Sequence, residues 1–131
     1  MTRSLQLLIL DDSPTDLEIF RLVTLHLDCE SFITQDYQEA AEFCMHNKVD
    51  VLISDLNVGE DSGFELMQLA LKSPNRSKMR RIIYTTESPA SNYDKLKQLD
   101  IVGWIVKPAE YESLLSTLNN ILHEIAFDQG S

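Results

Sequence analysis

Short apolar segments alternate with longer amphipathic segments five times along this chain. The apolar segments are rich in Leu, Ile and Val, and their apolar residues are continuous rather than alternating with polar ones. Such runs are typical of strands that are covered on both faces, as in a parallel sheet. The pattern therefore predicts five strands, at residues 6–10, 31–34, 51–54, 81–85 and 102–106.

The segments between these strands have the spacing of amphipathic helices. Ser13 and Pro14 are typical of an N-cap followed by the first helical residue. Phe20, Val23 and Leu27 then recur at intervals of three or four residues, which places them on one face. Further helices are predicted at residues 38–46, from Ser62 or Gly63 to about residues 73–75, at 89–99 and at 111–126.

Five strand–helix pairs within 131 residues predict one domain. It is assigned to residues 1–126, with residues 127–131 as a disordered tail or a cloning remnant. Alternating strands and helices indicate an α/β fold, and right-handed crossovers place helices on both faces of its sheet. The predicted architecture is a flavodoxin-like doubly wound (βα)5 sandwich, with a five-stranded parallel sheet of order 2-1-3-4-5.

Charge and composition narrow the function. The chain has 11 Lys and Arg against 21 Asp and Glu, a formal net charge of −10. Nucleic acid and anionic lipid bind to basic surfaces, so direct contact with nucleic acid or a membrane is not expected. No apolar run approaches the roughly 20 residues of a membrane span, and no signal peptide is recognisable. Cys29 and Cys44 are too few for a disulfide scaffold, which favours a reducing, cytoplasmic location.

Polar side chains with obvious chemistry follow four of the five predicted strands. In doubly wound folds, ligands collect at the carboxyl ends of the strands, so these side chains are expected at one edge of the sheet. They are Asp11 and Asp12 after the first strand, Asp55 after the third, Thr85 and Thr86 at the fourth, and Lys107 and Pro108 at the fifth.

Three carboxylates at one edge repel one another, by about 4 kcal/mol per pair at 4 Å and an effective dielectric near 20. A hard divalent cation relieves this repulsion, and Mg²⁺, with Mn²⁺ as a substitute, fits carboxylate oxygens while leaving room for a phosphate oxygen. A hydroxyl from Thr85 and an ammonium from Lys107 complete a cradle for an anion. Asp55 follows the central strand and is the candidate nucleophile for phosphoryl transfer.

Four sequence pieces in this order resemble the receiver domain of the two-component response-regulator family, over about residues 5–122. They are D11-D12, S54-D55-L56-N57, Y84-T85-T86 and G103-W104-I105-V106-K107-P108. The spacings also match the family: 43 residues from Asp12 to Asp55, 30 from Asp55 to Thr85, and 22 from Thr85 to Lys107. Each piece is common by itself, whereas all four at successive strand ends are a specific signal.

The resemblance implies a role for each matching residue. Asp55 would accept a phosphoryl group from a sensor histidine kinase or a phosphotransfer protein. Asp11, Asp12, Asp55 and the backbone carbonyl of Asn57 would hold Mg²⁺. Asn57 and Glu87 would flank the path of the attacking water and tune dephosphorylation, and this pair resembles that of single-domain chemotaxis-type regulators. The chain would then catalyse only its own phosphorylation and dephosphorylation and would not be an enzyme in the usual sense.

Further implied roles concern switching. Thr85 would hydrogen-bond one phosphoryl oxygen, and Lys107 would pair with another. The Lys107–Pro108 peptide is implied to be cis. Trp104 matches the aromatic switch position, whose ring changes rotamer as Thr85 moves toward the phosphate.

The resemblance also implies protein partners. The conformational change would pass to a downstream protein target, or to an output domain absent from this chain, through the face formed by residues 89–99, 102–106 and 111–126. The chain is expected to be a monomer or a weak dimer. A small basic cluster is expected to lie in a solvated loop or to contact an acidic partner, and it comprises Arg76, Lys78, Arg80 and Arg81.

Four positions depart from the family pattern. Gly59 stands where proline is common, Thr86 where a small residue is usual, Asp100 where glycine is common, and Ala109 where a bulky aromatic is frequent. None of them removes a catalytic group, so we expect a working site with altered loop dynamics.

Two other classes of protein remain to be separated from this one. A phosphohydrolase with an aspartyl nucleophile usually has a second acid two residues after the nucleophile, where this chain has Asn57. A flavodoxin-like electron carrier would need a Ser/Thr/Gly-rich phosphate cradle, which the segment D11-D-S-P-T15 does not supply.

Overall fold

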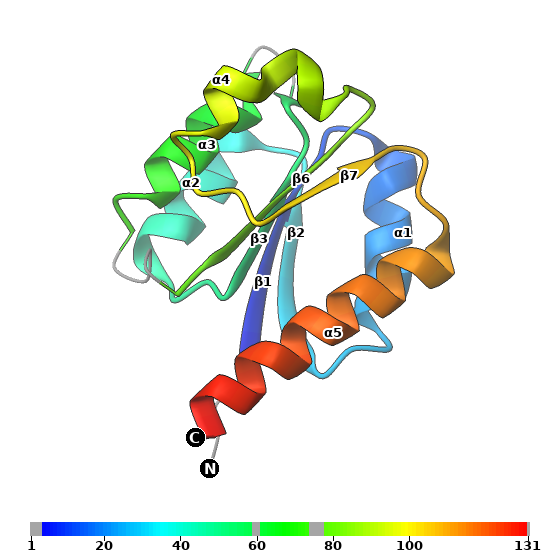
Figure 1. The fold of residues 1–131 in the computed structure, drawn as a ribbon. Helices are drawn as coiled ribbons and strands as arrows, with labels where there is room; N and C mark the ends of the chain where they lie inside the picture. The colour runs from blue at the N-terminus through cyan, green and yellow to red at the C-terminus, as the bar shows by residue number, and fades with distance from the viewer. Residues whose placement is uncertain (1–3, 59–60, 74–77, 131) are drawn as a thin grey trace.

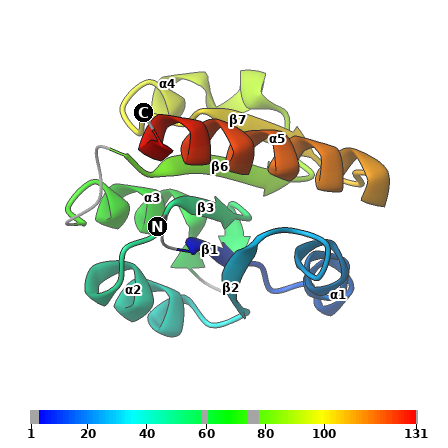
Figure 2. The same ribbon diagram turned by 90° about the horizontal axis from the view of Figure 1, so that it is seen from below.

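The computed structural model describes residues 4–58, 61–73 and 78–130. Its main element is a five-stranded parallel sheet of order β2-β1-β3-β6-β7 (Figures 1 and 2). These strands are Leu5–Leu10 (β1), Cys29–Thr34 (β2), Val51–Ser54 (β3), Arg80–Thr85 (β6) and Gly103–Val106 (β7). Counted within this sheet alone, the order is 2-1-3-4-5, so the predicted fold is confirmed.

Helices cover both faces of the sheet (Figure 1). Helix α1 (Pro14–Thr24) and helix α5 (Tyr111–Gly130) lie on one face and contact each other. Helix α2 (Tyr37–His46) and helix α3 (Gly63–Ala70) lie together on the other face. The predicted N-cap is confirmed, since the Ser13 side chain accepts a hydrogen bond from Asp16 N and Pro14 begins α1.

Alternate residues of each strand enter separate cores, which explains the continuous apolar runs. On β1, Leu8 and Leu10 pack toward α2 and α3, whereas Leu7 and Ile9 pack toward α1 and α5. All four are fully buried. Burying such side chains contributes roughly 1.5–3 kcal/mol each, so both faces of the sheet stabilise the fold.

The segment between β6 and β7 is less regular than predicted. Instead of one helix over residues 89–99, a 3₁₀ turn (Pro89–Asn92) is followed by a single α-helical turn, α4 (Tyr93–Leu96). Among the described side chains of this segment, Tyr93 is exposed and Leu99 joins the core. The described side chains of this segment bury little apolar surface, so a longer helix would gain little against the cost of nucleation.

The loop after β3 contains a small hairpin that the sequence pattern did not predict. Its strands are Asn57–Val58 (β4) and Asp61–Ser62 (β5), paired antiparallel. Helix α3 then begins at Gly63, as predicted, but ends at Ala70 rather than near residues 73–75. Gly59 and residues 74–75 lie outside the described residues.

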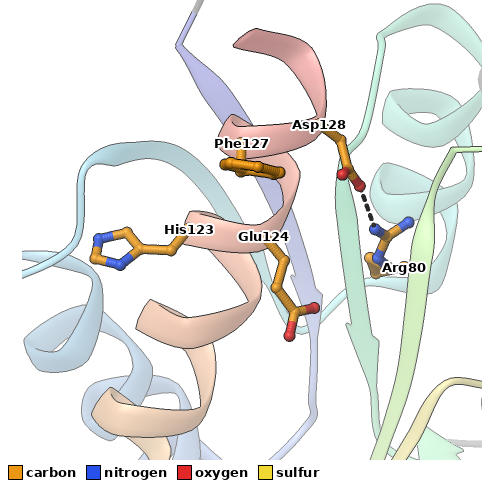
Figure 3. Close-up of a pocket in the computed structure, with 5 residues that line it drawn as sticks. All are labelled: Arg80, His123, Glu124, Phe127 and Asp128. Carbon is orange, nitrogen blue, oxygen red and sulfur yellow. Dashed lines mark hydrogen bonds and ion pairs between the residues drawn. The ribbon is translucent and has the colours of Figure 1, made fainter. Parts of the chain in front are cut away.

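Helix α5 continues past its predicted end at residue 126 and reaches Gly130. Ile125 anchors this last part of the helix in the core. Beyond it, Asp128 Oδ2 lies 3.5 Å from Arg80 Nη2, which ties the end of α5 to the start of β6 (Figure 3). Phe127 on the same turn is 77% exposed.

The residues of the predicted basic cluster do not all lie in a loop. Arg81 is not in a solvated loop but is 1% exposed within β6, with Nη1 3.4 Å from Asp100 Oδ2. Asp100 has a φ of 52°, in the left-handed region where glycine is favoured and Asp is tolerated. This turn therefore works without the glycine common in the family. Arg76 lies outside the described residues.

Across the described residues, none of the helices combines the length and apolar character that a bilayer crossing requires.

Candidate functional site

The predicted carboxylates meet at the carboxyl edge of the sheet. Parallel pairing of β1 with β3 sets Leu10 beside Ser54, and the backbone N–H of Asp55 donates to Leu10 O at 3.0 Å. One carboxylate oxygen from each of Asp11, Asp12 and Asp55 lies within 4.8 Å of the others. Such clustered hard oxygen donors fit a divalent cation of the Mg²⁺ type.

Asp11 is the most enclosed of these acids, with 1% of its surface exposed. Its Oδ1 accepts a hydrogen bond from Ser13 N at 2.9 Å. Burial raises the pKa of Asp11 above its ordinary value, opposed by its ion pair with Lys107 and its hydrogen bond from Ser13 N. The protein thus holds a carboxyl group where a negative charge is costly unless a cation lies beside it.

Lys107 supplies a cation within this edge. Its Nζ lies 2.8 Å from Asp11 Oδ2, 2.8 Å from Asp16 Oδ2 and 2.9 Å from Asp55 Oδ2. Burial lowers the pKa of Lys107, but hydrogen bonds with these carboxylates outweigh that effect and hold the pKa above its ordinary value. The lysine is therefore a permanent ammonium whose donors point at the candidate nucleophile.

Two features of the backbone occur at Lys107. The Lys107–Pro108 peptide bond is cis, as predicted. The Lys107 backbone N–H donates to Thr85 O at 2.7 Å, so the ends of β6 and β7 are joined next to the site. Thr85 is 1% exposed, and its Oγ1 accepts a hydrogen bond from Glu87 N at 3.4 Å.

The residues predicted to tune dephosphorylation contact each other. Asn57 Nδ2 donates to Glu87 Oε2 at 2.9 Å, across 30 residues of sequence. Trp104 Nε1 donates to the backbone oxygen of Glu87, also at 2.9 Å. The loop after Thr85 is thus linked both to the loop after Asp55 and to the predicted switch residue on β7.

Two polar groups of the site were missed by the sequence analysis, Asp16 and Tyr84. Asp16 lies in the first turn of α1, is 17% exposed at its side chain and contacts Lys107. The Tyr84 hydroxyl donates a long hydrogen bond of 3.5 Å to Asp16 Oδ1, and the Tyr84 ring centroid is 5.1 Å from Lys107 Nζ. In the sequence there was only a weak indication that Asp16 belongs to the site. It is an acidic residue four positions after Asp12, in the first turn of a predicted helix.

A third residue that matters to the site is Gly63, at the start of α3. Its N–H donates to Leu56 O at 2.8 Å. A Cβ on this residue would collide with the backbone oxygen of Asp55. Glycine here allows α3 to begin directly against the loop that carries the candidate nucleophile.

A hollow lies at the edge of the sheet opposite the acidic site. It is an open cavity of about 560 Å³, lined by Arg80 from β6 and by His123, Glu124, Phe127 and Asp128 from α5 (Figure 3). None of these residues lies at a strand's carboxyl end. The cavity is therefore separate from the acidic site.

A doubly wound α/β fold with clustered acids, a threonine and a lysine at the carboxyl edge is typical of the receiver domains of two-component signalling. The chain matches the response regulator receiver domain family over residues 7–119 and belongs to that family.

Individual relatives agree with this assignment. The chain is 24% identical to Protein PilH of Pseudomonas aeruginosa over 117 residues, which cover 89% of this chain and 97% of PilH. It resembles the chemotaxis response regulator CheY4 of Vibrio cholerae with a TM-score of 0.80 and 28% identity, over 91% of this chain and 99% of CheY4. A CheY-like receiver domain protein from Methanospirillum hungatei shares the fold, with a TM-score of 0.83 and 21% identity over 96% and 99% of the two chains.

Proposed function

We propose that this receiver domain is a phosphoacceptor switch in a two-component phosphorelay and that Asp55 carries the phosphoryl group. The observation that supports this most is the contact of 2.9 Å between Lys107 Nζ and Asp55 Oδ2, beside the oxygens of Asp11 and Asp12. A nucleophilic carboxylate flanked by a fixed cation and by other acids is what phosphoryl transfer requires. The donor is a sensor histidine kinase or a phosphotransfer protein.

The residues fit a bound Mg²⁺, because three hard oxygen donors converge at a partly open edge. Asp11, Asp12, Asp55 and the backbone carbonyl of Asn57 would hold it. When bound, the ion supplies charge neutralisation at the transferring phosphoryl group.

In the transfer step, an Asp55 oxygen forms a bond to phosphorus while the bond from phosphorus to the donor's imidazole nitrogen breaks. The electron pair of the broken bond stays on that imidazole. Lys107 donates a hydrogen bond to one phosphoryl oxygen, and the Thr85 hydroxyl donates to another. Both side chains are nearly buried, so their hydrogen bonds act in a medium of low polarity, where they stabilise the developing charge more strongly than in water.

Switching follows from the link between Thr85 and Trp104. If Thr85 moves toward the phosphoryl group, the loop that holds Glu87 moves with it, and Glu87 O is the acceptor of the Trp104 indole. The change would reach a partner through the surface of α4, β7 and α5. Tyr93, Val102 and Val106 are exposed apolar side chains in this part of the chain.

Dephosphorylation is governed in this proposal by Asn57 and Glu87. Their side chains are joined by a hydrogen bond of 2.9 Å, and the Asn57 backbone N–H donates to Asp55 Oδ1 at 3.4 Å, which supports a role close to the phosphoryl group. Both can orient a water molecule, so we expect the phosphoryl-aspartate to be fairly short-lived. A half-life of many hours would contradict this expectation.

The proposed setting is the cytoplasm, in agreement with two free cysteines. The partners are proteins rather than nucleic acid or membrane, and the chain acts as a monomer or a weak dimer. Capture of partners on beryllofluoride-treated and untreated protein would identify the downstream target.

Phosphorylation itself is tested with acetyl phosphate and Mg²⁺, followed by intact mass measurement. We expect one added phosphoryl group on the native chain and none on D55N. Steady turnover of free phosphomonoesters, without a phosphorylated protein, would instead identify an aspartyl phosphohydrolase. Binding of FMN would indicate an electron carrier.

A further inference from the structure

Asp16 is the carboxylate of the site that the proposed metal ligands do not include. Its Oδ2 lies 2.8 Å from Lys107 Nζ, as close as any other carboxylate contact of that lysine. The cluster of oxygens that converge for a cation comprises Asp11, Asp12 and Asp55. Asp16 therefore contacts the ammonium of Lys107 but does not belong to the group of oxygens that could hold a metal ion.

Lys107 has three N–H donors, and three carboxylates surround them. Two of these, Asp11 and Asp55, are also among the acids that would bind Mg²⁺. An ammonium beside both of them competes with an incoming cation for the same oxygens. Mg²⁺ can bind tightly only if Lys107 gives up its contacts with Asp11 or Asp55. The ammonium then needs another carboxylate as its partner.

Asp16 is held in position to be that partner. The buried Tyr84 donates its hydroxyl to Asp16 Oδ1 at 3.5 Å. Burial, followed by the nearby charge of Asp16, raises the pKa of Tyr84, so its hydroxyl remains a donor. The Tyr84 ring is fixed in turn by an edge-to-face contact with Phe20, with ring centroids 5.2 Å apart. Asp16 is thus oriented by a rigid part of the core.

We propose that Asp16 is a positioning residue that retains Lys107 when Mg²⁺ takes over the oxygens of Asp11 and Asp55. Asp16 favours Mg²⁺ binding because it gives Lys107 an ion-pair partner that does not bind the metal. It also keeps the ammonium within reach of the phosphoryl group on Asp55. This inference rests on the proposed function for the roles of Asp55 and Mg²⁺.

The test is a calorimetric Mg²⁺ titration of the full chain without phosphodonor. In D16A the lysine retains Asp11 and Asp55 alone, so Mg²⁺ must displace it from both. We expect Mg²⁺ affinity to fall about tenfold, the lower end of what outer-shell partners of a metal contribute. The matched control is E18A, which removes one negative charge from the same helix at an exposed position paired with Arg21. We expect its affinity to stay within about twofold of the native chain, since exposed ion pairs contribute little.

A double-mutant cycle separates positioning from the simple loss of a negative charge. K107M removes the competing ammonium and should bind Mg²⁺ more tightly than the native chain. In that background D16A should change the affinity by less than about twofold, because Asp16 acts through Lys107. An equal loss of affinity from D16A in both backgrounds would overturn the inference. So would a D16A chain that binds Mg²⁺ as E18A does, a result that is decisive even if K107M fails to fold.

Because no phosphodonor is present, the titration is independent of phosphoryl transfer. A native chain that binds Mg²⁺ but is not phosphorylated by acetyl phosphate contradicts the proposed function. A native chain that is phosphorylated, with D16A unchanged in Mg²⁺ affinity relative to E18A, contradicts only the role of Asp16.

Discussion

Charged side chains gather at both edges of the sheet, but they are arranged differently. At the amino edge, Arg80 lies beside Asp128 and Arg81 beside Asp100, with one cation for each carboxylate. At the carboxyl edge, the single ammonium of Lys107 lies among several carboxylates.

This difference distinguishes charged pairs that stabilise the fold from an excess of like charges at the candidate site. In an ion pair of one cation and one carboxylate the two charges compensate each other. At the amino edge, such pairs join elements that are distant in sequence. An excess of carboxylates is costly, because like charges repel strongly where water is largely excluded. In the proposed function, the same excess of carboxylates binds a divalent cation and supplies the nucleophile for phosphorus, which would explain why this cost is kept at the carboxyl edge. We therefore expect changes at the two edges to differ in their dependence on Mg²⁺.

The largest effect on stability is expected from K107M. Removing one partner of a buried ion cluster costs about 3 kcal/mol, since Asp11 and Asp55 are left without their cation. The free energy of unfolding in urea should fall by that amount in metal-free buffer, and Mg²⁺ should restore much of it. K97M, at an exposed lysine, serves as control. A loss that Mg²⁺ does not reverse would show that the carboxylates are not the cause.

G63A is expected to be next in size. The added methyl group collides with the backbone oxygen of Asp55, so α3 or the loop must shift at a cost of about 2 kcal/mol. Phosphorylation by acetyl phosphate should slow as well, because this loop carries Asp55, the proposed nucleophile. The control is G103A, whose Cβ would meet the Ile82 side chain at an ordinary 3.5 Å. Equal stability of the two variants would refute the proposed close approach.

At the amino edge, D100N should have a moderate effect that does not depend on Mg²⁺. Asn tolerates the φ of 52° at this position, so the change mainly removes the charge that faces the buried Arg81. We expect the free energy of unfolding to fall by about 1 kcal/mol. The rate of phosphorylation should remain that of the native chain. A clear change in that rate would mean that the two edges are coupled.

The smallest effect is expected for D128A. The contact between Asp128 and Arg80 is partly open to solvent, and such pairs contribute about 0.5 kcal/mol or less. Urea unfolding should detect little change, and added salt should reduce the difference further. A loss above about 1 kcal/mol would show that the end of α5 depends on this pair more than its exposure suggests.

Much of the fold could be predicted because its signals are local. Continuous apolar runs identify buried parallel strands, and right-handed crossovers then limit the possible sheet orders. The segment before β7 and the end of α5 were predicted wrongly for the opposite reason. How far each of these helices extends depends on which of its side chains reach the core: Leu99 does so only after α4 has ended at Leu96, and Ile125 does so near the end of α5.

The site divides in the same way. The sequence alone determined that Asp11, Asp12, Asp55, Thr85 and Lys107 would share one edge, because parallel strands end together there. Only the tertiary structure decided which atoms of that edge meet. The direction of a side chain on α1 brings Asp16 to Lys107, and the packing of Tyr84 against Phe20 holds it there. The end of a strand determines at which edge of the sheet a residue lies. Which charged group that residue pairs with depends on the directions of side chains from other elements, and these elements meet only in the folded protein.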